Sequence, residues 1–382
     1  MMETGNFKST KCVHAGKSPD SDGVVGHIQP STAYRYLESG SQPYPRYFNT
    51  PNQQNLVEKI CQLENAEDGL VFSSGMAAIT TTLSSMLSRG DHIVLQRAIY
   101  GGTHTYVIEE FERVGIEFTF VDCDLAEVAK AIRPETRVVY AETPANPLLQ
   151  IMDLAGVAKI AAEKNIISVV DNTFASPINQ NPIDLGIDVV VHSGTKYLGG
   201  HSDLSFGTAV SDRDNVDRIR QKAVLYGGSL NPLSIYLAER SIKTLAVRVE
   251  RQNQNAMSLA NFLDQHSAVE AVYYPGLAGH VAHDVAAEQM QGFGGMLSFS
   301  LRSELSSLKL LQNLKLIEAA MSLGGVETTA TLPATTSHKT MPQEEREQQG
   351  ITDQLVRLSV GIESSEDLIR DLDQAIKELA SH

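Results

Sequence analysis

The chain has 382 residues, of which 42% are hydrophobic and 20% charged, and its formal net charge is −15 at pH 7. This length allows a large buried core and favours two domains, and the acidic balance argues against a nucleic-acid-binding surface. We find no apolar run of membrane-spanning length and no apolar signal core, and we therefore expect a cytoplasmic protein. Cys12, Cys61 and Cys123 are scattered, and His280 and His283 form an isolated pair, so we expect neither disulfides nor a metal site.

The first 52 residues have little periodicity and are rich in Gly, Pro, Ser and Tyr. A long irregular arm on a compact protein is usually a tail or an embrace between subunits. We expect three parts: an N-terminal arm (1–52) that embraces a neighbouring subunit, a first domain (53–246) and a C-terminal domain (247–382).

Helical patterns alternate with short β-rich runs through residues 53–246. The expected helices include Asn55–Glu64 and Met76–Leu87, and the expected strands are His92–Leu95, Glu117–Val121, Arg137–Ala141, Ile167–Val170, Asp188–Val191 and Gly207–Val210. This alternation is typical of an α/β domain with a mostly parallel sheet, which binds ligands at the carboxyl ends of its strands.

The remaining third of the chain predicts a second, smaller domain. A long helical segment, about Asn231–Gln265, leads into it, and Ser364–Leu379 reads as a closing amphipathic helix. Met296–Leu301 and Leu355–Val360 read as strands, and the polar segment Gln343–Gln349 as a surface helix or loop.

A lysine and an aspartate follow two of the expected strands. Lys196 comes after Ser193, Gly194 and Thr195, and Asp171 follows Ile167–Val170, 25 residues earlier. That separation leaves room for one crossover and one further strand, so both side chains can lie at one edge of a parallel sheet. A solvated surface lysine is the ordinary alternative. The pair nevertheless suits pyridoxal phosphate (PLP), because lysine forms its Schiff base and an acid keeps its pyridine nitrogen protonated.

Two further segments allow an anionic, planar ligand. Ser73-Ser-Gly-Met76 opens a helical pattern, and N–H groups at a helix start favour an anion, although an ordinary capped helix has the same appearance. Tyr100-Gly-Gly allows an aromatic ring to lie on a planar ligand, although it also reads as a turn.

Other residues suit a substrate carboxylate. Arg357 interrupts an apolar strand and has the geometry for a bidentate grip, and Ser322-Leu-Gly-Gly brings backbone donors. Asn146 lies between two prolines in a rigid loop that aims its amide. A surface arginine and ordinary turns are the alternatives.

Taken together, these segments resemble the Cys/Met metabolism (transsulfuration) family of PLP enzymes. The likeness runs from Val13-His-Ala-Gly16 to Glu366-Asp-Leu-Ile369, through the blocks SSGMAAI, YGGT, VVDNTFASP, HSGTKYLGGHSD, SLGGVE and VRLSVGIE. The resemblance implies the α/β PLP fold type I, similar to aspartate aminotransferase, with a large, mostly parallel domain and a smaller C-terminal one. It also implies a homotetramer built from two active dimers.

The resemblance also implies a role for each residue. Lys196 bonds to PLP and later moves protons, Asp171 pairs with the pyridine nitrogen, and Tyr100 stacks on the ring and serves as acid or base. The phosphate is held by Gly75, Met76, Ser193 and Thr195, and by Tyr44 and Arg46 from the neighbouring subunit. The substrate carboxylate contacts Asn146, Ser322 and Arg357.

The activity implied is elimination on a sulfur-containing amino acid, first of all γ-lysis of cystathionine to cysteine, 2-oxobutanoate and ammonia. Glu327 matches an acid of the γ-specific members, and Tyr100-Gly-Gly lacks the cysteine of the methionine γ-lyase motif. γ-Replacement on an O-acylhomoserine, β-lysis of cystathionine and γ-lysis of methionine stay open, because Pro43 and Phe48-Asn-Thr-Pro51 depart from the family pattern at the entrance. A catalytically silent PLP-binding protein is the alternative from another class.

Overall fold

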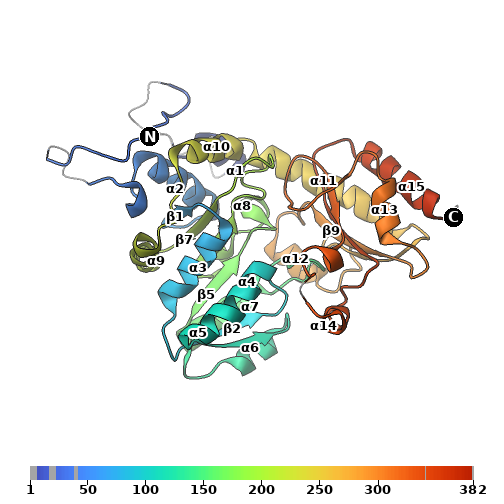
Figure 1. The fold of residues 1–382 in the computed structure, drawn as a ribbon, viewed down its shortest axis with the longest axis horizontal. Coiled ribbons are helices and arrows are strands. Elements are labelled where there is room, and N and C mark those ends of the chain that lie inside the picture. Colours follow the sequence, from blue (N-terminus) through green and yellow to red (C-terminus); the bar gives the residue numbers. More distant parts are fainter. Residues whose placement is uncertain (1–6, 17–22, 38–41, 340, 381–382) are drawn as a thin grey trace.

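The computed structural model describes residues 7–16, 23–37, 42–339 and 341–380. One part of the chain is built on a seven-stranded sheet and the other on a five-stranded sheet. The long helix α11 (Leu245–Asp264) runs from the first part into the second (Figure 1).

The large sheet has the strand order β1-β7-β6-β5-β4-β2-β3. Neighbouring strands from β6 to β3 are parallel, whereas β7 is antiparallel to both β1 and β6. The strands are β1 (Asp68–Phe72), β2 (His92–Gln96), β3 (Glu117–Val121), β4 (Thr136–Glu142), β5 (Ile167–Asp171), β6 (Val189–Ser193) and β7 (Gly207–Ser211).

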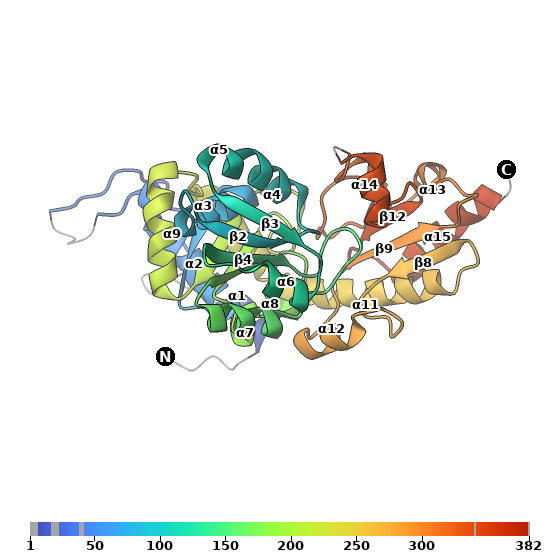
Figure 2. The same ribbon diagram turned by 90° about the horizontal axis from the view of Figure 1, so that it is seen from below.

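Helices cover both faces of the large sheet (Figure 2). Along β4, Val138 and Tyr140 enter one hydrophobic core together with residues of α3 (Gly75–Met86) and α9 (Arg213–Tyr226). Val139 and Ala141 enter the other core, with α2 (Pro51–Glu64) and α7 (Leu154–Lys164). Because both faces are buried, these strands read as apolar runs in the sequence.

The five-stranded sheet has the order β10-β11-β12-β9-β8 and is antiparallel except for the β10–β11 pair. Its strands are β8 (Val269–Tyr273), β9 (Met296–Leu301), β10 (Glu318–Ala319), β11 (Thr329–Thr331) and β12 (Leu355–Ser359). The helices α13 (Ser307–Asn313) and α15 (Ser365–Ala380) pack against each other, and α15 also contacts α11.

The remaining helices are shorter or connect these layers. They are α1 (Lys8–His14), α4 (Gly101–Tyr106), α5 (Glu112–Val114), α6 (Leu125–Ala131), α8 (Ser176–Asn179), α10 (Pro232–Ile242), α12 (His283–Gln289) and α14 (Gln343–Gln348), with 3₁₀ turns η1 (Pro45–Tyr47), η3 (Pro182–Leu185) and η4 (Pro333–Thr335) and a π-helical turn η2 (Val107–Phe111).

Two expectations about secondary structure are wrong. The segment predicted as one helix, Asn231–Gln265, is two helices, α10 and α11. The chain breaks at Thr244, where ψ is 6° and the hydroxyl donates to Ser241 O at 3.1 Å. The N-terminal segment is not irregular throughout, because α1 buries Cys12 completely against the core. The limits of the three parts stay a prediction.

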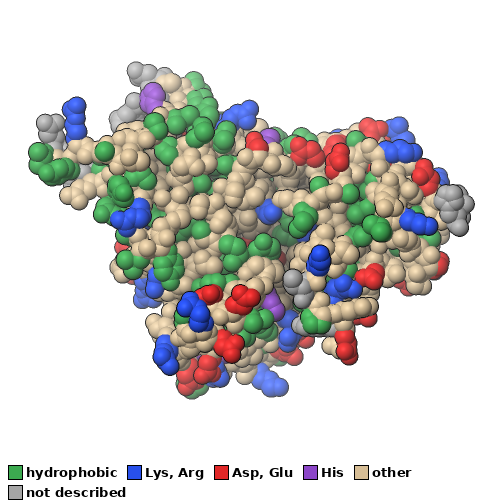
Figure 3. Space-filling view, viewed as in Figure 1, with side chains coloured by type: hydrophobic (Ala, Val, Ile, Leu, Met, Phe, Trp, Pro, Cys, Tyr) green, Lys and Arg blue, Asp and Glu red, His purple; other side chains and the backbone are tan. Residues whose placement is uncertain are grey.

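Among the residues that the structure describes, no helix is long and apolar enough to cross a membrane. On the face shown in Figure 3, lysine and arginine side chains are dispersed among acidic ones and form no single basic patch. Within the described ranges, His, Cys, Asp and Glu side chains form no group of three that could hold a metal ion.

Candidate active site

The carboxyl ends of three parallel strands form the floor of a cavity. Asp171 ends β5, Ser193 ends β6, and Glu142 ends β4 and is the register partner of Asp171. Lys196 follows β6 and lies at the same edge. The spacing of Asp171 and Lys196 therefore predicts their common location, because the carboxyl ends of parallel strands meet at one edge.

This cavity has a volume of about 310 Å³. It brings together most of the residues singled out in the sequence, namely Gly75, Met76, Tyr100, Asn146, Asp171, Ser193, Thr195, Lys196, Ser322 and Arg357. Its other lining residues were not predicted, namely Ser74, Ile79, Glu142, Thr173, Phe174, Met321, Leu323 and Ser337. Both domains expected from the sequence thus contribute to one site.

The amine of Lys196 is held by the loop that begins at Ser322. Lys196 Nζ donates to Ser322 Oγ at 2.9 Å. This loop crosses close over the lysine backbone, because a Cβ on Gly324, whose φ is +75°, would lie 2.8 Å from Tyr197 N. Desolvation, with a smaller contribution from the Arg357 cation, lowers the pKa of Lys196. The amine therefore reaches its neutral, nucleophilic form more readily than a surface lysine does.

Asp171 is a buried carboxylate on the cavity floor, with 4% of its surface exposed. Its Oδ1 accepts from Thr173 N at 3.0 Å and from the Thr173 hydroxyl at 2.5 Å. The same hydroxyl accepts from Ser193 N at 2.8 Å, which ties the ends of β5 and β6 together. Burial raises the pKa of Asp171 despite these hydrogen bonds. A cationic partner in the cavity would stabilise the ionised form.

The N-terminus of α3 opens onto the cavity beside Ser193. Ser74 caps this helix by accepting from Ala77 N at 3.1 Å, so the N–H groups of Gly75 and Met76 have no acceptor within the helix. A Cβ on Gly75 would lie 2.7 Å from Ser193 Cβ, so only glycine allows this close approach. These donors, with the Ser193 and Thr195 hydroxyls, suit a phosphate group.

Arg357 is a buried cation whose hydrogen-bonding capacity is incompletely used. It is 6% exposed, and it donates from Nη1 to Asn146 Oδ1 at 2.8 Å and from Nη2 to Ser322 O at 3.2 Å. Both acceptors are neutral, and its Nε has no hydrogen-bond partner within the described part of the chain. Burial lowers the pKa of Arg357 to about 10. A carboxylate bound in the cavity would supply the missing countercharge.

The cavity therefore fits PLP on the chemistry of its own side chains. A phosphate suits the start of α3, a protonated ring nitrogen suits the buried Asp171, and an aldehyde suits the amine of Lys196. Tyr100, whose surface is 49% exposed, lies beside these groups and offers a ring face for stacking.

Glu142 is one of the lining residues that the sequence analysis did not predict. Its Oε2 accepts from Tyr100 N at 2.7 Å, and burial together with the charge of Asp171 raises its pKa to about 8. The signal that identified Asp171, an acid directly after a buried strand, applies equally to Glu142.

Three predicted residues do not line the cavity. Tyr44 directly precedes η1 and Arg46 lies within it, and Arg46 Nη1 donates to Val224 O of α9 at 2.7 Å. Glu327 is exposed and accepts from the Ser202 hydroxyl at 3.3 Å. The roles assigned to these residues through a neighbouring subunit and in substrate choice stay predictions.

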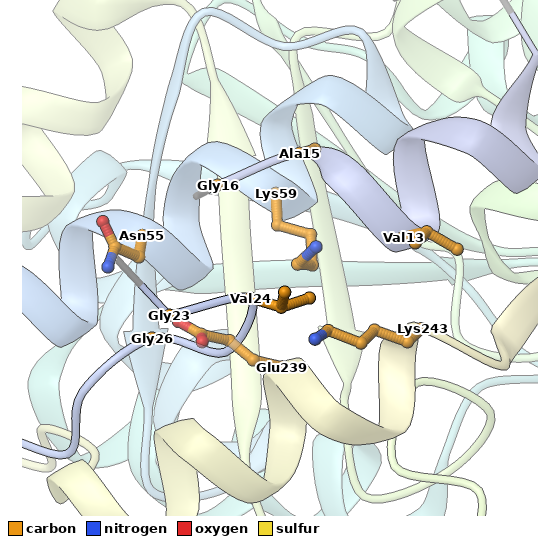
Figure 4. A pocket seen from close by; sticks show the side chains of 10 residues that line it. All are labelled: Val13, Ala15, Gly16, Gly23, Val24, Gly26, Asn55, Lys59, Glu239 and Lys243. Atoms are coloured by element: carbon orange, nitrogen blue, oxygen red, sulfur yellow. The ribbon is translucent and has the colours of Figure 1, made fainter. Parts of the chain in front are cut away.

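A smaller cavity lies between the N-terminal segment, α2 and α10 (Figure 4). Lys59 lies in the wall of this cavity and donates from Nζ to Cys12 O at 3.0 Å. Glu239 extends towards the backbone at Gly23 and Gly26. Burial raises the pKa of Glu239 to about 7, against the opposing effects of Lys59 and Lys243. The Lys59 hydrogen bond links the N-terminal segment to the large domain.

The chain is similar to known proteins of a PLP-dependent family. The sequence profile of the family described as Cys/Met metabolism PLP-dependent enzyme matches residues 9–377. Over 358 residues the chain is 46% identical to cystathionine beta-lyase MetC of Bacillus subtilis, covering 93% of this chain and 91% of that protein. Over 348 residues it is 45% identical to L-methionine gamma-lyase of Fusobacterium nucleatum, covering 90% and 88%.

A solved structure is similar over nearly the whole fold. It is cystathionine gamma-lyase from Lactobacillus plantarum complexed with L-serine, which is 38% identical to this chain. The TM-score is 0.94, and the superposition covers 98% of this chain and 99% of that one.

Proposed function

The chain belongs to the family of Cys/Met metabolism PLP-dependent enzymes, and from this premise we propose that it cleaves L-cystathionine on the γ side, giving cysteine, 2-oxobutanoate and ammonia. The relatives that are 46% and 45% identical to this chain are carbon–sulfur lyases, and they support a lyase activity for it.

The observation that carries the proposal is the meeting of Lys196, Asp171 and Arg357 in one cavity. Lys196 and Arg357 are linked through Ser322, which accepts from the lysine through its hydroxyl and from the arginine through its carbonyl. A substrate carboxylate held by Arg357 therefore lies within reach of the lysine amine. This arrangement suits an α-amino acid whose Cα proton must be removed.

The residues of the cavity divide the work. Arg357 binds the substrate carboxylate, and Asn146 and Ser322 orient the guanidinium. PLP, when bound, takes up the electron pair left at Cα, and Asp171 keeps its ring nitrogen protonated. Lys196 Nζ takes the Cα proton, and its lowered pKa favours the neutral amine that this step needs.

Cleavage on the γ side needs a second proton to move, from Cβ, before the sulfur leaves. Lys196 would serve this step as well, once it has released the Cα proton to the bound cofactor and is neutral again, and the Cβ proton it takes would then go to the leaving sulfur. Glu327 lies in the loop that begins at Ser322. The γ-specific members that this chain resembles carry an acid at this position, and this likeness supports the γ assignment.

β-Elimination is the second candidate, because the relative at 46% identity is a cystathionine beta-lyase. It needs only the Cα proton and the same floor. γ-Replacement on an O-acylhomoserine uses the same residues with a different leaving group, so the products of the reaction distinguish all three.

The proposed active unit is a dimer, within a homotetramer. Tyr44 and Arg46 lie away from the cavity of their own chain, which supports a role at the phosphate of a neighbouring subunit.

The test is product analysis by mass spectrometry with purified enzyme loaded with PLP. Cysteine and 2-oxobutanoate from L-cystathionine alone are the expected products. Homocysteine and pyruvate as products would show that the protein is a β-lyase and not a γ-lyase. Turnover only with an O-acylhomoserine plus cysteine or sulfide would make the protein a γ-replacement enzyme.

A further inference from the structure

The carboxylate of Glu142 contacts two different loops. Glu142 ends β4 and is 3% exposed. Its Oε2 accepts from Tyr100 N at 2.7 Å, and its Oε1 accepts from Asn146 N at 3.4 Å. Its own N–H donates to Gln96 Oε1 at 3.3 Å, at the end of β2. Glu142 is thus anchored to the sheet through its backbone, and its side chain connects the two loops.

The two loops carry different parts of the site. Tyr100 directly precedes α4 and presents its ring to the cavity beside the start of α3. Asn146 accepts from Arg357 Nη1 through Oδ1 at 2.8 Å. The first loop therefore serves the cofactor side of the cavity, and the second serves the carboxylate side.

Glu142 also lies directly beside Asp171. The two residues are register partners at the ends of β4 and β5. Burial and the charge of Asp171 raise the pKa of Glu142 to about 8. A cation bound to Asp171 would relieve this repulsion and strengthen the ionised Glu142 as an acceptor. Occupation of the floor and the order of both loops are thus physically linked.

We propose that Glu142 is a positioning residue that holds the Tyr100 and Asn146 loops at fixed distances from the floor, through one hydrogen bond to each backbone N–H. It acts through Tyr100 on PLP binding and through Asn146 and Arg357 on substrate binding. Only the part of this inference that concerns substrate binding rests on the proposed function.

Two variants test this geometry from opposite sides. At a pH above 8, where Glu142 is ionised and accepts through both oxygens, Glu142→Gln keeps the length of the side chain but has a single acceptor oxygen, so one of the two N–H groups loses its partner. Glu142→Asp keeps the charge but is shorter and reaches only one loop. The matched control is Asp188→Asn. Asp188 lies at the opposite edge of the sheet, where its Oδ2 accepts from Ser168 N at 2.8 Å.

Absorbance titration of PLP-free protein gives the dissociation constant of PLP. In Glu142→Gln and Glu142→Asp it is expected to rise about tenfold, the effect of one lost buried acceptor. In a Tyr100→Ala background the same changes should add little, because the residue they act through is gone. A merely structural role would make the two effects add.

The KM for L-cystathionine measures the effect on substrate binding. Either Glu142 variant is expected to raise it about tenfold, and to raise it little further in an Asn146→Ala background. Wild-type constants in both Glu142 variants, or full additivity in both backgrounds, would overturn the proposal. If Glu142→Gln does not fold, Glu142→Asp carries both measurements, with the thermal midpoint of Asp188→Asn as reference.

The two proposals fail in different ways. An enzyme that binds PLP but does not cleave cystathionine would refute the proposed function. The PLP titrations of the Glu142 variants would still test the inference. An enzyme that cleaves cystathionine while its Glu142 variants bind PLP normally would refute the inference alone.

Discussion

The floor of the cavity and its mouth are built differently. The floor consists of buried residues at strand ends, Asp171 and Glu142, which are hydrogen-bonded within one chain. At the mouth, Met321 lines the cavity and is 66% exposed. Glu327 and Arg46 lie outside the cavity of their own chain, where Glu327 is exposed and Arg46 is bonded to α9. The floor thus depends on the fold of one chain, whereas we propose that phosphate binding also needs a neighbouring subunit and that substrate choice depends on exposed loops.

The largest effect is expected on the floor, from Lys196→Ala. Loss of the amine removes both the bond to PLP and the base for the Cα proton, so turnover should fall about 10³-fold or more. Steady-state product formation measures the loss, and the absorbance of bound PLP should change with it. Lys164→Ala, which removes an exposed lysine from the end of α7, is the control. Turnover near the wild-type rate in Lys196→Ala would refute the mechanism.

Arg357→Ala tests the carboxylate side of the same cavity. Substrate binding should weaken by about 2–4 kcal/mol, because the carboxylate loses its cationic partner, while PLP stays bound. The KM for L-cystathionine and the PLP content of the purified protein measure the two effects. Arg302→Ala removes an exposed arginine from the small-sheet part as a control. Loss of PLP instead would move Arg357 from the substrate to the cofactor.

The floor is also the region that the sequence predicts well. Apolar runs between polar ends identify β5 and β6 because both faces of these strands are buried. An acid and a lysine at their carboxyl ends must then meet. Glu142 carries the same signal at the end of β4 but was not among the predicted site residues, whereas Asn146, in the loop that follows β4, was.

The mouth and the connecting helices are less predictable, for physical reasons. α9 has many charged residues and little apolar signal, so its helical pattern was not recognised. The break at Thr244 depends on a local hydrogen bond to Ser241, which no periodicity reveals. The positions of Arg46 and Glu327 depend on loops whose contacts are not encoded by a repeating pattern.

Arg46→Ala tests whether the mouth is shared between subunits. Loss of a phosphate contact should weaken PLP binding by about ten- to a hundredfold. Mixing this variant with Lys196→Ala under conditions that exchange subunits should then restore about a quarter of the wild-type activity, because half of the dimers are mixed and each has one intact site. No recovery in proven mixed dimers would show that the arm serves its own chain. Arg218→Ala on α9 is the control.

The smallest effect is expected from Glu327→Ala. This side chain is exposed and contacts Ser202 rather than the cavity, so its loss should leave PLP binding and folding unchanged. We expect the ratio of γ to β products from L-cystathionine to fall by about 1.4- to fivefold, the range of an exposed, screened charge. Glu327→Gln separates charge from size, and Glu318→Ala removes another exposed acid, on β10 of the five-stranded sheet, as a control. Because the floor is unchanged in this variant, a shifted ratio with an unaltered total rate would assign specificity to the mouth. An unchanged ratio would assign it to the floor or to the neighbouring subunit.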